Sequence, residues 1–124
     1  MTADEFRRMA LALPGVEERS HMGHPDFRVR GKIFATLGSP DAQWGMVKVA
    51  PDEQLALLAA HPDVFVSAKG AWGEQGSTLV RLERADAAVV RETMISACAT
   101  ISEKTSSGAA SNAKRPRKMG TKKR

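Results

Sequence analysis

Residues 20–37 constrain the fold more strongly than any other part of this sequence. Apolar and basic residues alternate over 27–30, the run 32–37 is rich in β-branched and aromatic residues, and Gly31 separates the two. Two short runs of this kind, joined by a glycine turn, are typical of a β-hairpin. We therefore predict a hairpin here and place it at the centre of a small sheet.

An amphipathic helix is predicted before this hairpin. Thr2 and Glu5 have the spacing of a capping box, and an apolar stripe with helical periodicity begins at Phe6. Pro14, which is followed by a glycine, ends the helix. The polar residues 16–20 are interpreted as a connection to the hairpin.

Three strands and one helix are predicted between residues 43 and 82. The strands are expected at residues 43–49, 64–66 and 78–82. The helix begins at Pro51, a residue suited to a first helical turn, and its buried side is expected to consist of Leu55, Leu57 and Leu58. The glycine-rich segment 67–77 is expected to be a loop whose Trp72 folds over the sheet.

A last helix is predicted after Asp86, which can cap it. Its apolar stripe has helical spacing and consists of Val90, Met94, Ala97, Cys98 and Ile101. The predicted element order is α-β(3)-α-β(2)-α. Because hairpins pair antiparallel and the helices must cover one sheet, we predict an α+β fold, a two-layer sandwich with an antiparallel five-stranded sheet.

The net charge of +5 conceals two regions of opposite sign. From Lys104 onward there are eight basic residues and no acidic one; the eleven basic and fourteen acidic residues before it give residues 1–103 a net charge of −3. The segment 104–124 has almost no apolar bulk, and such a composition cannot offset the entropy lost on ordering. We therefore predict one α+β domain over 1–103 and a disordered basic tail over 104–124 that meets a polyanion.

Membrane and secreted proteins are disfavoured by the sequence. No apolar run approaches the ~20 residues needed to span a bilayer, and the N-terminus MTADEFRR lacks the basic and apolar regions of a signal peptide. The single cysteine, Cys98, rules out an internal disulfide and suits a reducing compartment. We expect a cytoplasmic protein without a membrane partner.

No set of residues predicts catalysis or a metal centre. His21, His24 and Asp26 are of types that bind zinc or iron, but no further cysteine or histidine cluster supports them. We expect His24 and Asp26 to hydrogen-bond the backbone instead. Cys98 is interpreted as a core residue, and the glycines of 70–76 precede a strand, whereas a phosphate-binding loop precedes a helix. We therefore predict no enzymatic activity, no metal and no cofactor.

Several segments of the sequence resemble a known family. GHPDFRV at 23–29 and GKIFATL at 31–37 are similar to the signature of the MmcQ/YjbR family of small bacterial proteins, and LPGVEE at 13–18 and Trp72-Gly73 before a strand also fit. The resemblance covers residues 3–101. It implies an α-β(3)-α-β(2)-α fold similar to that of secretion chaperones, and DNA binding through a double-wing motif.

Basic residues near the hairpin and in the tail are the candidate nucleic-acid contacts, because phosphates need such donors and a β-ribbon fits the major groove. They are Arg28, Arg30, Lys32, Lys48, Lys69, Lys114, Arg115, Arg117, Lys118, Lys122, Lys123 and Arg124. An ordinary solvated strand face also explains the first five.

The leading hypothesis is therefore a DNA-binding protein. The alternative is a protein- or peptide-binding adaptor that uses the sheet face as secretion chaperones do, with the tail serving only solubility. A third hypothesis, with the least support, is an enzyme or small-molecule binder with a pocket beside His24 and Trp72.

Overall fold

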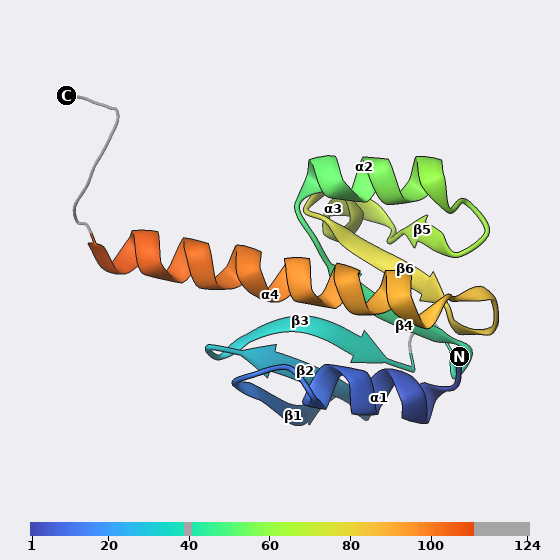
Figure 1. The fold of residues 1–124 in the computed structure, drawn as a ribbon, viewed down its shortest axis with the longest axis horizontal. Helices are drawn as coiled ribbons and strands as arrows, with labels where there is room; N and C mark the ends of the chain where they lie inside the picture. Colours follow the sequence, from blue (N-terminus) through green and yellow to red (C-terminus); the bar gives the residue numbers. More distant parts are fainter. Residues whose placement is uncertain (39–40, 111–124) are drawn as a thin grey trace.

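The fold is an antiparallel sheet with helices packed on one face (Figure 1). The computed structural model describes residues 1–38 and 41–110, with side chains described up to residue 103. Within these residues the sheet has six strands in the order β1-β2-β3-β4-β6-β5. The elements are α1 (Ala3–Leu11), β1 (Val16–His21), β2 (His24–Val29), β3 (Lys32–Leu37), β4 (Trp44–Lys48), α2 (Pro51–Ala60), β5 (Phe65–Ser67), α3 (Gly70–Glu74), β6 (Ser77–Arg81), the 3₁₀ helix η1 (Leu82–Arg84) and α4 (Ala87–Ala110).

Helices α1, α2 and α4 share one face of the sheet. Phe6 of α1 lies against Phe27 of β2, with ring centroids 6.3 Å apart, and Met94 of α4 is fully buried in the same core. Gln54 of α2 donates through Nε2 to Oγ1 of the buried Thr78 at 3.1 Å. No helix in the described part of the chain is both long and apolar enough to cross a membrane.

Two tight turns join the first three strands. His21 pairs with His24 across Met22-Gly23, and Val29 pairs with Lys32 across Arg30-Gly31. Both central residues of each turn have positive φ, 52° and 81° in the first turn and 53° and 77° in the second. Type I′ hairpin turns require this backbone, and it matches the right-handed twist of the strands. The predicted hairpin over 20–37 is confirmed, with Arg30-Gly31 as a two-residue turn.

The first strand corrects the predicted count of five. Residues 16–20 were expected to be a connection, but Val16–His21 form β1, which pairs antiparallel with β2. Only Val16 of this strand is partly buried. Because β1 lies at the edge of the sheet, its side chains stay in solvent and show no apolar alternation; charged residues are common on such strands.

Two corrections concern the region between β4 and β6. The leucines of α2 were expected to be its buried residues, but Leu55 is 67% exposed, and the buried side chain is Gln54, whose Nε2 also donates to the Ser77 carbonyl at 3.0 Å. This amide binds polar groups at the start of β6 and can therefore be buried. The predicted loop contains the short helix α3, and its Trp72 points into solvent, 70% exposed, rather than folding over the sheet.

The first and last helices, α1 and α4, have the predicted N-terminal caps. In α1, the Glu5 amide donates to Thr2 Oγ1 at 3.1 Å and the Thr2 amide donates to Glu5 Oε1 at 2.7 Å, the two bonds of a capping box. In α4, the Ala88 amide donates to Asp86 Oδ1 at 2.8 Å. α4 continues to Ala110 and so includes residues 104–110 of the predicted tail. The remainder of the predicted tail, 111–124, lies outside the described residues.

Met94 provides a test of the core. It is fully buried between α4 and the sheet, and we expect Met94→Ala to lower the free energy of unfolding by about 2–4 kcal/mol, because the truncated side chain leaves a cavity. The neighbouring Ile95 is 45% exposed, so Ile95→Ala should change stability by less than ~1 kcal/mol. Denaturant unfolding measures both. Equal effects would contradict the orientation of α4.

Candidate nucleic-acid interface

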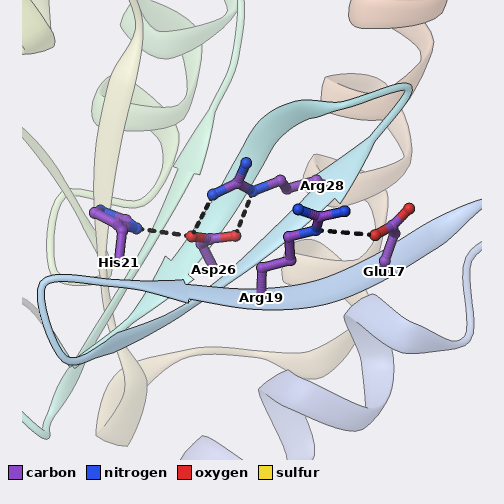
Figure 2. Close-up of polar contacts among 5 residues, drawn as sticks. All are labelled: Glu17, Arg19, His21, Asp26 and Arg28. Atoms are coloured by element: carbon purple, nitrogen blue, oxygen red, sulfur yellow. Dashed lines mark hydrogen bonds and ion pairs between the residues drawn. The ribbon is translucent and has the colours of Figure 1, made fainter.

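The uncovered face of β1 and β2 carries charged side chains. Phe27 points into the core, so its neighbours Asp26 and Arg28 point to the opposite face. The register places Arg19 of β1 opposite Asp26 and Glu17 opposite Arg28. Figure 2 shows these residues lying together across the two strands. The alternation over 27–30 seen in the sequence thus separates a core face from a polar face.

Asp26 is the centre of this polar group. Its carboxylate has no exposed surface; Oδ1 accepts a hydrogen bond from Arg28 Nε at 2.8 Å, and Oδ2 accepts one from Arg28 Nη2 at 3.1 Å and one from His21 Nδ1 at 2.7 Å (Figure 2). A buried carboxylate needs such partners. The bonds from Arg28 are the largest effect holding the Asp26 pKa below its ordinary value of 3.8, whereas burial opposes them.

Arg28 is therefore engaged within the protein. Two of its donor atoms are bound to Asp26, and its side chain is mostly buried. Arg19, on the neighbouring strand, pairs with Glu17 at 3.1 Å. From the sequence, Arg28 was predicted to be a phosphate contact. Asp26 and Arg28 are two residues apart on one strand and therefore lie on the same face, and this spacing is a sequence signal for their ion pair.

His21 and His24 make different contacts. His21 hydrogen-bonds Asp26, and because an ionised carboxylate only accepts, Nδ1 of His21 is the donor. His24 packs over Gly38, where an added Cβ would lie 3.0 Å from His24 Nδ1. Asp26 thus binds two side chains, not the backbone groups that the sequence suggested. In the described part of the chain no three His, Cys, Asp or Glu side chains are grouped to hold a metal ion.

Four other predicted cations gather at one end of the sheet. Arg30 lies in the β2–β3 turn and Lys32 follows it, Lys48 ends β4, and Lys69 precedes α3. β3 begins where its antiparallel neighbour β4 ends, so Lys32 and Lys48 lie at the same end of the sheet. Lys48 pairs with Ser77 of β6, and the Ser77 carbonyl accepts a hydrogen bond from the amide of Ala68, the residue before Lys69, at 3.0 Å. All four side chains are exposed, and none makes an ion pair within the described residues. We call these four residues the basic end.

The last helix leads toward the same end. In Figure 1, β3 and α4 run in opposite directions, so α4 finishes at the end of the sheet where β3 begins. Seven predicted contacts follow α4 in the sequence, outside the described residues: Lys114, Arg115, Arg117, Lys118, Lys122, Lys123 and Arg124. α4 itself ends on the side of the molecule that carries the basic end.

Two surface hollows lie elsewhere. One is lined by residues of α1 and its following turn together with Arg91, and the other by Asp63, Arg81, Glu83 and Arg84. Neither hollow includes His24 or Trp72. The hypothesis of an enzyme or small-molecule binder had predicted a pocket beside these two residues. Cys98 packs against the core, and its burial raises the pKa of the thiol to about 11, so it stays protonated near neutral pH.

Comparison with known proteins identifies a family and a fold. A family model described as YjbR matches residues 11–97. The crystal structure of the Deinococcus radiodurans protein DR2400, which has a DUF419 domain, is similar with a TM-score of 0.70 and 17% sequence identity, covering 98% of this chain and 95% of that one. At this identity the similarity establishes the α+β fold. Among curated proteins, none matches this sequence.

Proposed function

This chain belongs to the YjbR family, and we propose that it binds nucleic acid through the basic end and the basic residues that follow α4. The observation that carries this proposal is the basic end itself: four exposed cations without ion-pair partners among the described residues, at one end of a sheet. Cations free of internal partners can bind phosphates without first breaking an ion pair, which Arg28 cannot do.

The size of the basic end fits a phosphate backbone. Neighbouring strands are ~4.8 Å apart, so the step from β3 across β4 and β6 to β5 is roughly 15 Å, comparable with about four base pairs at ~3.4 Å each. The tight turn at Arg30-Gly31 places two of the cations at the tip of a hairpin. Contacts of this kind position a nucleic acid but carry no sequence information, so we propose binding with little sequence preference.

Charge-matched variants test this proposal. In a protein that ends at Ala110, we expect Arg30→Gln with Lys32→Gln to reduce the slope of log affinity against log salt for a duplex DNA by up to ~2, because each phosphate that a cation neutralises contributes about 0.9 to this slope. Arg84→Gln with Arg91→Gln removes the same charge from exposed positions beyond β6 and early in α4. This control should leave the slope nearly unchanged. Fluorescence anisotropy over a salt series measures both.

Two results would contradict the proposal. An equal decrease for both pairs would mean that net charge, not the basic end, determines binding. No binding by the full-length protein at low salt would remove nucleic acid as the ligand.

The second candidate function, a protein- or peptide-binding adaptor, rests on another part of the sheet. Met46, Leu79 and Val66 pair in register across β4, β6 and β5 on the face opposite the core, and Val66 is exposed. Beside them, the Arg81 guanidinium lies 4.6 Å from the Trp44 ring. An apolar row with this polar border could receive a protein segment. Failure to bind DNA at low salt, with loss of a protein partner on Leu79→Glu, would favour this function.

A further inference from the structure

Trp72 is an unusually exposed aromatic side chain. It is 70% exposed on α3, while all four phenylalanines are buried in the core. A tryptophan in solvent offers a large flat ring with no partner in the described structure, and such residues are concentrated at binding surfaces.

The backbone that carries Trp72 is fixed closely against the sheet. A Cβ added at Gly73 would collide with the carbonyl oxygen of Ala68, and one added at Gly76, where φ is +106°, would collide with that of Val49. The Gly76 carbonyl accepts from the Val49 amide at 3.0 Å. These close approaches hold α3 against the ends of β4 and β5, so the Trp72 ring is exposed from a fixed backbone rather than from a loose loop.

Two cations of the basic end lie on segments next to α3. Lys69 is the residue before α3, and Lys48 is paired with Ser77, the first residue of β6 after α3. Both are exposed without ion pairs among the described residues, and Glu74 is the only acidic residue within α3. An exposed aromatic ring with unpaired ammonium groups on neighbouring segments matches the chemistry of a nucleotide, which carries a base and a phosphate.

We propose that Trp72 stacks on an unpaired nucleobase while Lys48 and Lys69 bind the adjacent phosphates, so that single-stranded nucleic acid is the preferred ligand. This inference rests on the proposed function, because it uses the same basic end. In a duplex each base face is covered by its neighbours, so only a single strand offers a face to Trp72. Stacking accepts every base, so the preference is for strandedness and not for sequence.

The test compares an oligothymidine of about 20 nucleotides, longer than a typical single-strand site, with a duplex of the same length. We expect Trp72→Ala to weaken oligothymidine binding roughly tenfold, which is in the range measured for one stacked base, and to change duplex binding less than about twofold. Trp72→Phe keeps a ring and should retain most of the affinity. Leu55→Ala, which removes another exposed apolar side chain from α2, should change neither.

Intrinsic fluorescence provides a second readout. In a Trp44→Phe background Trp72 is the only tryptophan, and oligothymidine should quench its emission more strongly than duplex does. If both probes bind but Trp72→Ala weakens neither and no quenching occurs, the stacking inference is overturned while the proposed function stands. If neither probe binds at low salt, both are overturned.

Discussion

Replacing Asp26 with alanine is expected to lower the free energy of unfolding by about 2–4 kcal/mol, somewhat less than the loss of one partner from a fully buried ion pair, because the Arg28 and His21 side chains are partly exposed. The substitution removes three hydrogen bonds at once and leaves the Arg28 guanidinium and His21 Nδ1 without their acceptor. Glu17→Ala is the matched control, because it breaks an exposed ion pair on the same face and should cost less than ~1 kcal/mol. Urea unfolding of the two variants measures the difference.

The pH dependence of the same site gives an independent check. The Asp26 pKa in the folded protein is below its ordinary value of 3.8. The ionised carboxylate therefore stabilises the fold fully above about that pH, and this stabilisation is lost as the pH falls through the folded pKa. We expect the stability difference between the natural protein and Asp26→Asn to decrease below pH 3.8. A difference that stays constant to low pH would contradict the ionised state of Asp26.

Removing residues 111–124 is expected to have the largest effect on nucleic-acid binding. This deletion takes away seven cations and no acidic residue, and it leaves α4 complete. If each cation contacts one phosphate, the full-length protein should lose ~10³-fold or more in affinity between 50 and 200 mM salt. The truncated protein, with a net charge of −2, should lose far less.

A full-length variant with the same seven cations changed to glutamine separates charge from length. It should behave as the deletion does. A truncated protein that keeps the whole salt dependence would show that the tail takes no part in binding.

The parts of the fold that follow local rules could be predicted from the sequence. The capping box at Thr2 and Glu5 and the apolar stripe of α4 depend only on spacing within one element. The turn at Arg30-Gly31 likewise depends on a glycine between two short strands. These features do not need knowledge of what lies opposite them.

The features that the sequence missed depend on tertiary position. The strand β1 is stabilised by pairing with β2, and its exposed side chains give no periodic signal. In α2, Gln54 is buried because it faces Ser77 and Thr78, which are distant in sequence, while Leu55 remains exposed. No helical pattern identifies which residue of α2 meets a polar partner.

The sequence named the residues of the candidate site, but not their contacts or their exposure. From the sequence, the cations of the basic end were identified as donors, but they were not separated from Arg28, because the two-residue spacing between Arg28 and its partner Asp26 was not used. The exposure of Trp72 could not be predicted either, because it depends on close contacts of Gly73 and Gly76 with backbone from other parts of the chain.

The most direct test of the central claim is an amide NMR titration of the protein ending at Ala110 with oligonucleotide at low salt. If the basic end binds phosphate, the largest shifts should be those of residues near Gly31, Lys48 and Lys69, decreasing as salt is added. Shifts concentrated instead at the Met22-Gly23 turn, or along the row of Met46, Leu79 and Val66, would contradict it.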